Sequence, residues 1–150
     1  MKKLLFFTAL LACLFGMSVT GFAKTDEDEA AKEAYETAIA DNWKDMLQNS
    51  IALDKINAEN KTHLLKWQDV EDPSEEAKKL VTELLELQKN QEKEQESMDP
   101  YMQAKKNCDE KLNADGANAA LENVIRIQKD RLADQEEIAA RWKKVNKLLE

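Results

Sequence analysis

Apolar side chains recur at intervals of three and four residues from residue 26 to the end of the chain. This spacing places them on one face of an α-helix. Gln128, Gln135 and Asn146 interrupt the most regular row with polar groups, which cost stability and which we expect to set helix register or oligomeric state. The members of that row alternate four and three apart, like a heptad seam: Leu121, Ile125, Gln128, Leu132, Gln135, Ala139, Trp142, Asn146 and Leu149.

Three earlier segments carry weaker rows of the same kind. In residues 26–70 the row is Tyr35, Ile39, Trp43, Met46, Leu53, Ile56, Leu64 and Trp67, and a bend is expected near 57–61, where asparagines and a lysine crowd the pattern. In residues 73–97 it is Leu80, Leu84 and Leu87, with Val81 and Leu85 beside it. In residues 100–114 it is Tyr101, Ala104, Cys108 and Leu112.

Three breaks punctuate these rows and predict the helix ends. In Asp72-Pro73-Ser74-Glu75, Asp72 is the expected N-cap and Pro73 fits the first helical turn. Asp99-Pro100 repeats the signal, and Asp115-Gly116 is typical of a helix end with a left-handed glycine. We therefore predict helices over about 26–70, 73–97, 100–114 and 117–149. Strand signals are absent, so the fold class is all-α.

The apolar rows are narrow, and a narrow row cannot cover a wide globular core. The pattern therefore predicts a single all-helical domain over residues 24–150, built as an elongated hairpin or bundle with coiled-coil-like seams. A self-associating coil is the alternative. Residues 88–97, QKNQEKEQES, contain no apolar anchor, so the sequence leaves open whether they are ordered.

The first 23 residues differ from the rest and read as an export signal. Lys2 and Lys3 precede the apolar run 4–15, and Gly21 and Ala23 form a small-residue cleavage site. We predict a signal peptide over 1–23, cleavage after Ala23, and a location in the bacterial periplasm or at the cell surface.

Gly16 and Ser18 offer a weaker second cleavage site, and two alternatives to such a cleaved signal remain. Leu10-Leu11-Ala12-Cys13 resembles a lipobox, which would make Cys13 a lipid anchor, although residues 14–23 stay apolar where a polar tether would begin. The uncharged stretch 4–23 is also long enough to stay in the membrane as an uncleaved anchor.

Composition changes sharply once residues 1–23 are set aside. The remaining 127 residues hold all 30 acidic residues of the chain against 20 basic ones, and 67 of them are Ala, Glu, Lys, Leu or Arg, as in long helices. Nucleic-acid binding is not expected of so acidic a chain. The C-terminal RWKKVNK is a small basic patch, which we interpret as a helix end with favourable charge.

Residues suited to catalysis are scarce after position 23. His63 is the only histidine, and Glu59 four residues earlier would supply only half of a metal site. Cys108 has no partner cysteine once Cys13 is removed, so we expect a free thiol, either buried or bridging two chains. No phosphate-binding, nucleophile-elbow or calcium motif is present. We therefore predict no catalytic residues, no cofactor and no metal.

These observations predict a non-enzymatic interaction protein of the cell envelope, adhesin-like or chaperone-like. It would bind itself or another protein through Trp43, Trp67 and Trp142 or through its narrow seams. The alternative is a periplasmic carrier of a small ligand or metal, held between helices near His63 and Cys108.

Overall fold

The structure is a computed structural model that describes residues 25–150. The predicted signal peptide, its cleavage site at Ala23 and the alternative anchor at Cys13 lie outside the described residues. Every regular element within 25–150 is an α-helix and none is a strand, which confirms the all-α prediction. The chain divides into a unit that ends at Ala30 and a second unit, Ala31–Glu150, that contains the helix bundle.

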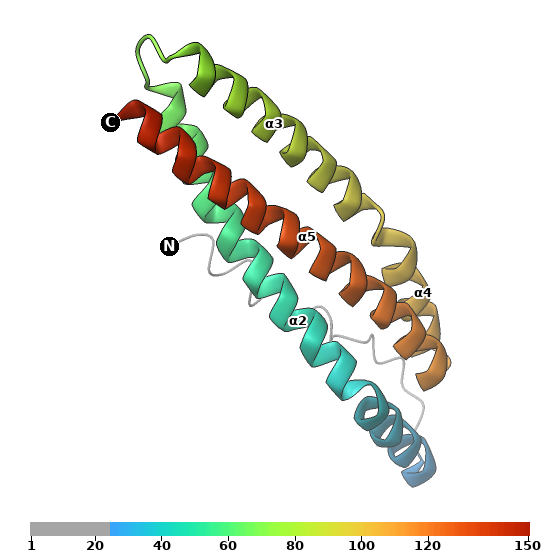
Figure 1. The fold of residues 1–150 in the computed structure, drawn as a ribbon. Coiled ribbons are helices and arrows are strands. Elements are labelled where there is room, and N and C mark those ends of the chain that lie inside the picture. The colour runs from blue at the N-terminus through green and yellow to red at the C-terminus, as the bar shows by residue number, and fades with distance from the viewer. Residues whose placement is uncertain (1–24) are drawn as a thin grey trace. The chain divides into compact units, whose positions relative to one another are not determined.

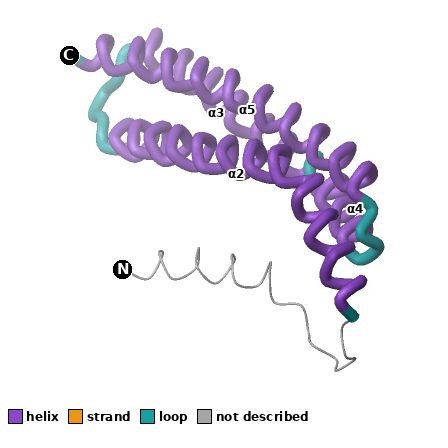
Figure 2. Tube along the Cα trace, turned by 90° about the horizontal axis from the view of Figure 1, so that it is seen from below, coloured by secondary structure: helices purple, strands orange, loops and turns teal. Residues whose placement is uncertain are grey.

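Four helices follow one another along the chain: α2 (Asp26–Gln68), α3 (Glu75–Glu96), α4 (Asp99–Asp109) and α5 (Ala114–Leu149). Within Ala31–Glu150, α2 and α5 run in the same direction, and α3 followed by α4 runs in the opposite direction (Figure 1). Figure 2 shows the two loops that reverse the chain, residues 69–74 after α2 and residues 110–113 after α4. The backbone of α5 lies closer to α3 and α4 than to α2.

The first turn of α2 is stabilised by its own residues. The Asp28 backbone N–H donates to Thr25 Oγ1, and the Thr25 N–H donates to Asp28 Oδ2, each at 3.3 Å. This reciprocal pair is a capping box, which satisfies N–H groups that have no partner within the helix. Four acidic residues in that turn also face the positive end of the helix dipole.

The turn between α2 and α3 corrects one predicted cap. Ser74, not Asp72, caps α3, and its side chain accepts a hydrogen bond from the Ala77 N–H at 3.2 Å. Asp72 instead takes a left-handed backbone conformation with φ of 51°. Asp and Asn tolerate this conformation better than most residues, so Asp72 makes the reversal and Ser74 starts the helix.

The turn between α4 and α5 also differs from the prediction. The chain leaves α4 after Asp109, earlier than expected, and reverses at Leu112, whose φ is 50°. Asn113 then caps α5 by accepting a hydrogen bond from the Gly116 N–H at 3.1 Å. Gly116 therefore lies inside the first turn of α5 rather than at a helix end, and it does not have a positive φ.

α2 is continuous through residues 57–61, where the sequence predicted a bend. Its inner side has positions spaced alternately four and three residues apart, and none of them is exposed. Asparagines and a histidine fill several of these positions, which explains why the apolar row looked irregular. The inner positions are Tyr35, Ile39, Asn42, Met46, Asn49, Leu53, Ile56, Asn60, His63 and Trp67.

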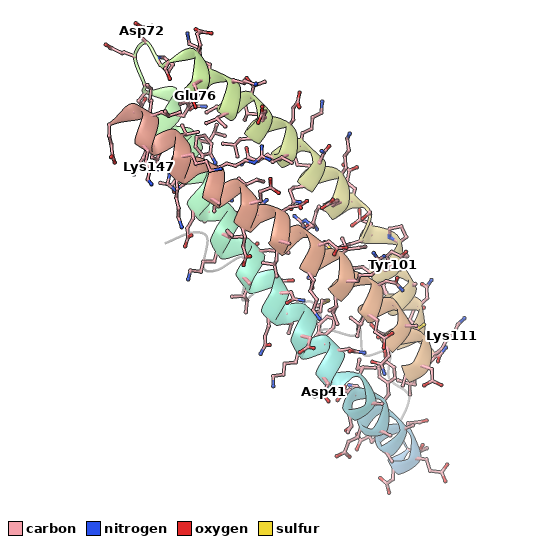
Figure 3. The ribbon with its side chains drawn as sticks, viewed as in Figure 1. Asp41, Asp72, Glu76, Tyr101, Lys111 and Lys147 are labelled. Atoms are coloured by element: carbon pink, nitrogen blue, oxygen red, sulfur yellow. The ribbon has the colours of Figure 1, made fainter. Side chains whose placement is uncertain are left out.

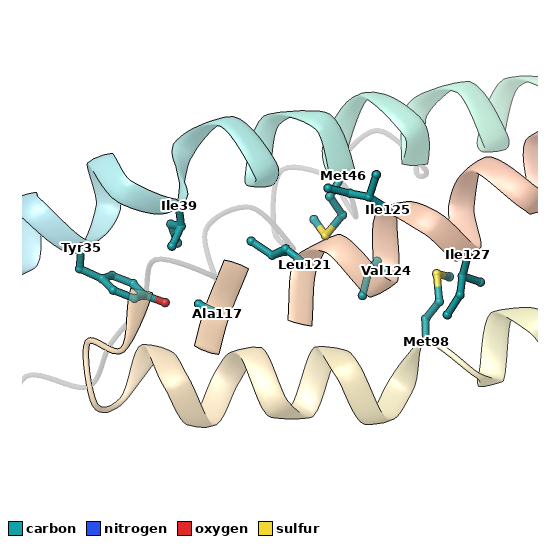
Figure 4. Close-up of a cluster of buried hydrophobic side chains, with 9 residues drawn as sticks. All are labelled: Tyr35, Ile39, Met46, Met98, Ala117, Leu121, Val124, Ile125 and Ile127. Carbon is teal, nitrogen blue, oxygen red and sulfur yellow. The ribbon is translucent and has the colours of Figure 1, made fainter. Parts of the chain in front are cut away.

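Two groups of buried apolar side chains form the core of the bundle. The first cluster consists of Tyr35, Ile39, Met46, Met98, Ala117, Leu121, Val124, Ile125 and Ile127 (Figure 4). The second cluster consists of Val81, Leu84, Ile138, Trp142 and Val145. Along α5 the first cluster ends at Ile127 and the second begins at Ile138, so a stretch of about three turns separates them.

Polar side chains occupy the space between the two clusters. We call this set the polar layer: Ser50, Asn60, Gln91, Gln128, Arg131 and Gln135, contributed by α2, α3 and α5. Gln91 is buried within residues 88–97, so that stretch is held in α3 by a polar contact instead of an apolar anchor. The polar interruptions predicted at Gln128 and Gln135 thus serve contacts within one chain.

Candidate functional site: the outer face of α2

The three tryptophans predicted to face a partner differ in their exposure. Trp142 is 1% exposed and lies in the second cluster, so its burial removes it from the surface of this arrangement. Trp67 is half-buried against the same cluster. Trp43 is half-buried beside the first cluster, with the Lys105 ammonium 4.4 Å from the centre of its ring, a cation–π contact.

His63 is part of the packing around Trp142. The two rings stack with their centres 5.9 Å apart, and His63 Nδ1 lies 3.2 Å from Asn146 Nδ2. This contact uses a polar position of the predicted α5 row, Asn146, to orient the imidazole. His63 therefore acts as an inner residue of α2 in this structure.

Cys108 lies at the other end of the bundle. Its sulfur packs against Gly116, at the start of α5, whereas His63 contacts residue 146, near the end of α5. Thirty residues of helix separate these two places, which is about 45 Å. Figure 3 shows the two ends, with Glu76 and Lys147 at one and Tyr101 and Lys111 at the other. The structure thus does not bring together the His63 and Cys108 of the predicted carrier site.

A small polar network surrounds Cys108. The Tyr35 hydroxyl donates a hydrogen bond to Asp109 Oδ1, and the Lys105 ammonium pairs with Asp109 Oδ2 at 2.7 Å. Burial raises the pKa of the Tyr35 hydroxyl well above its usual range, and the hydrogen bond to Asp109 adds to the shift. Lys105 is 9% exposed, so Asp109 supplies the charge that makes its burial possible. The half-buried free thiol of Cys108 lies beside this network.

The polar layer holds several buried atoms without a hydrogen-bond partner. Asn60 is completely buried, and its Oδ1 accepts no hydrogen bond. Gln128 Oε1 is likewise buried and accepts no hydrogen bond, and Arg131 Nε is buried and donates none. Burial lowers the pKa of Arg131, while the nearby charges of Glu94 and Asp54 oppose that shift. Because unpaired buried polar groups cost free energy, these atoms lower the stability that this layer contributes.

Two hollows open to solvent flank α5. The first has a volume of about 320 Å³ and is lined by Glu94, Ser97, Tyr101, Arg126, Ile127 and Asp130. Burial raises the pKa of Glu94, and the charge of Asp134 contributes. The second, of about 400 Å³, is lined by Asn42, Asp45, Glu122, Ile125, Arg126, Lys129 and Asp130. Neither is lined by a histidine or cysteine, the usual partners in nucleophilic catalysis.

The outer face of α2 carries apolar side chains that the core does not use. Ile51 is 62% exposed and Leu65 is 53% exposed, the two highest values among the large apolar side chains of residues 25–150. Ala58 lies midway between them and is also exposed. We call these three residues, each seven apart, the outer row. Two inner positions, Leu53 and Asn60, lie about half a helical turn around α2 from Ile51 and Ala58. The outer row therefore lies on the side of α2 opposite the core.

The outer row lies among exposed lysines. Lys44 precedes Ile51 by seven residues and continues the row, Lys55 follows Ile51 by four, and Lys61 precedes Leu65 by four. Within the described residues, none of these three ammonium groups forms an ion pair. Asp45, Asp54 and Glu59 are exposed in the same stretch, so the charge around the row is mixed and its apolar side chains are the feature open to a partner.

Sequence reasoning missed this face, although its signal is visible in the chain. The prediction assigned one apolar face to each segment, whereas α2 carries a second row on the side opposite the core. The spacing of seven between Ile51, Ala58 and Leu65 is the signal that would have revealed it.

Comparisons with known proteins add no family to these observations. No protein-family model, no curated protein and no solved structure matches the chain. Within residues 25–150, no three His, Cys, Asp or Glu side chains gather as a possible metal site. No helix of that part of the chain has the length and apolar character needed to cross a membrane.

Proposed function

We propose that this chain is a non-enzymatic interaction protein of the bacterial cell envelope, and that the outer row of α2 is the surface that holds its protein partner. The observation that carries the proposal is the exposure of Ile51 and Leu65 on the side of α2 opposite the core. Single exposed apolar residues are ordinary on a protein surface. A row of three at heptad spacing on one helix is not ordinary, because this outermost position of a packed helix is usually polar.

The row favours a helix as the partner. Covering an isoleucine or leucine completely is worth about 1.5–3 kcal/mol, so a partner that covers Ile51 and Leu65 gains useful binding free energy. Seven residues of helix rise about 10.5 Å, and a facing helix repeats its side chains over the same distance. A second helix can therefore contact the outer row at each of its three members.

The placement of the reactive side chains supports an interaction role over catalysis. His63 stacks on Trp142 inside the bundle, and Cys108 packs beside Gly116 far from it. A catalytic pair would need these groups within hydrogen-bond reach. Export by residues 1–23 rests on the order of charge, apolar run and small residues in the sequence, and places the partner in the periplasm or at the cell surface.

Site-specific photocrosslinking in the exporting bacterium tests the proposal. A photoreactive phenylalanine derivative replaces Ile51, Leu65 or Leu85 in the full chain. Leu85 is the matched control, since it is 45% exposed but lies on α3. We expect one discrete adduct, the same at positions 51 and 65 and absent at 85. Adducts that are equal at all three positions, or no adduct at 51 and 65, would overturn the proposal.

A further inference from the structure

Two carboxylates from different helices share one side-chain amide at the edge of the polar layer. Gln91 of α3 is 3% exposed, and its Nε2 donates to Glu94 Oε2 and to Asp134 Oδ2, each at 2.9 Å. Two oxygens bonded to the two hydrogens of one amide lie about 5 Å apart, a distance at which like charges alter each other's ionisation. We call Glu94 of α3 and Asp134 of α5 the carboxylate pair.

Negative charge outweighs positive charge around the carboxylate pair. No lysine or arginine within residues 25–150 forms an ion pair with either member. Arg131 acts on Glu94 from α5, but its guanidinium is buried and its Nη1 donates to Gln95 Oε1. Asp130 adds a third negative charge from α5, and Arg126 pairs with it at 3.7 Å. The closest arrangement is therefore the one between the two carboxylates that share Gln91.

The other elements near Glu94 add little charge. From α2, Asp54 acts on Arg131, and from α4, Tyr101 lines the same hollow as Glu94. A tyrosine hydroxyl is neutral below about pH 10, so Tyr101 adds no charge at neutral pH. On α3 itself, the positions three and four residues from Glu94 are uncharged: Asn90, Gln91, Ser97 and Met98.

Glu94 is placed to exchange a proton with solvent. Its side chain is half-buried, and the hollow of about 320 Å³ that it lines is open to solvent. Burial raises the pKa of Glu94, and the charge of Asp134 adds to the shift. An ionised carboxylate only accepts hydrogen bonds, whereas a protonated one also carries an O–H donor. Protonation of Glu94 therefore removes the repulsion within the pair and supplies a donor that Asp134 can accept.

We infer that the carboxylate pair is a pH-sensitive clasp, in which protonation of Glu94 in mild acid strengthens the contact between α3 and α5 and its ionisation weakens that contact. The clasp belongs to the fold and does not depend on the proposed partner surface. It also adjoins the polar layer, because Gln91 accepts a weak hydrogen bond from Gln135 at 3.4 Å. A change at the pair therefore reaches the layer that joins all three long helices.

The opposite pH dependence would hold if Glu94 served mainly to neutralise Arg131. That guanidinium is 6% exposed and forms no ion pair in the part of the chain that the structure describes. A negative charge nearby stabilises a buried cation, so in that case protonation of Glu94 would weaken the fold. The sign of the pH dependence distinguishes these two roles.

Urea unfolding of the full chain at a series of pH values tests the inference. Glu94→Gln removes the charge and keeps a side chain of nearly the same shape. Asp134→Asn removes the repulsion from the other helix, so it serves as a second test if the first variant does not fold. Glu92→Gln is the matched control, since it makes the same charge change at an exposed position of α3.

The expected sign follows from proton binding. The folded state binds a proton at Glu94 more readily than the unfolded state does, so the stability due to this group rises as the pH falls through the raised pKa. We expect Glu94→Gln to have a higher urea midpoint than the parent at about pH 8, and the difference to vanish toward about pH 4.5. Asp134→Asn should show a smaller pH dependence than the parent, and Glu92→Gln the same dependence as the parent.

Three results would overturn the inference. The first is a Glu94→Gln midpoint below that of the parent at about pH 8, which would assign Glu94 to Arg131 instead. The second is a difference between the parent and Glu94→Gln that is the same at every pH. The third comes from amide hydrogen exchange, corrected for the intrinsic rate at each pH. Protection of residues 88–96 should rise in the parent as the pH falls and should not rise in Glu94→Gln, and equal behaviour of the two chains would exclude a clasp at this place.

Discussion

Asn60 of α2 and Gln135 of α5 join the two parallel helices of the bundle at a completely buried point. The Asn60 amide donates to Gln135 Oε1 at 2.7 Å and to the Gln135 backbone carbonyl at 3.2 Å. Gln135 in turn donates to Gln91 of α3 at 3.4 Å, a weak contact. These side-chain amides thus connect α2, α5 and α3 by hydrogen bonds between the two apolar clusters.

Replacing Asn60 with alanine should lower stability. The substitution leaves Gln135 Oε1 buried without its donor, which costs about 1–3 kcal/mol, and it opens a small gap, while removal of the unpaired Asn60 Oδ1 offsets part of this cost. Urea unfolding followed by circular dichroism measures the change as a lower midpoint with an unchanged slope. Asn90→Ala, an exposed asparagine of α3, is the control and should change stability by less than about 0.5 kcal/mol. Equal midpoints for the two variants would contradict the role assigned to the Asn60–Gln135 contact.

A substitution at Gly116 tests the close contact between α4 and α5. A Cβ atom there would lie 2.7 Å from Cys108 Sγ and 2.8 Å from Asn113 Nδ2, and both distances are too short. Overpacking costs about 1–3 kcal/mol, while alanine gains up to about 1 kcal/mol in helix propensity, so we expect Gly116→Ala to lose about 1 kcal/mol.

The control for Gly116→Ala removes the sulfur. Cys108→Ala in the same chain should restore part of the loss, because one of the two clashes disappears. Thermal unfolding of the single and double variants gives the coupling between the two positions. A Gly116→Ala chain more stable than the parent would show that the two helices separate readily at this end.

The sequence predicted the helices and most of their inner faces. The α5 row is buried or half-buried from Leu121 to Asn146, and only its last member, Leu149, is exposed. Apolar residues spaced four and three apart lie on one side of a helix, and this spacing sufficed to predict which side of α5 is buried. The prediction was weaker for the segment 100–114, where Ala104 and Leu112 are exposed and Lys105 is buried instead. There a charged residue lies inside because Asp109 compensates it, which a hydropathy pattern cannot reveal.

The polar layer and the helix ends could not be predicted from the spacing of apolar residues. Asn60 looks like a helix interruption until its partner, 75 residues later, is known. Similarly, Asp72 and Ser74 are both good caps, and the choice depends on which of them the chain needs for the reversal. The outer row was visible in the sequence, but its exposure followed only from the placement of the inner positions.

The hydrogen bond from Tyr35 to Asp109 makes stability depend on alkaline pH. The pKa of Tyr35 is raised in the folded state, chiefly by burial, whereas the pKa of tyrosine in an unfolded chain is about 10. The Tyr35 hydroxyl therefore contributes its full share to the free energy of unfolding below that pH. This share is lost as the pH rises toward the pKa of Tyr35 in the folded state. Tyr35→Phe removes the hydroxyl, so the difference in the free energy of unfolding between the parent and this variant should shrink between about pH 9 and about pH 11.

Urea unfolding at several pH values measures that difference. Tyr101→Phe is the control, because the Tyr101 hydroxyl makes no hydrogen bond within residues 25–150. The decline toward high pH should be specific to Tyr35→Phe. If the parent and Tyr35→Phe differ in stability by the same amount at every pH, the Tyr35 hydroxyl is not held by Asp109 in solution.

The two sides of α2 should respond oppositely to the same substitution. Leu53→Ala removes a side chain that is 4% exposed, and we expect a loss of about 2–5 kcal/mol in the free energy of unfolding. Leu65→Ala removes one that is 53% exposed, and should cost less than about 0.5 kcal/mol. Chemical denaturation of both variants measures these values. In the crosslinking experiment the ranking reverses, since Leu65→Ala should weaken the adduct formed at position 51. A Leu65→Ala variant that unfolds like Leu53→Ala would instead place the outer row inside the fold and remove the basis for a binding surface there.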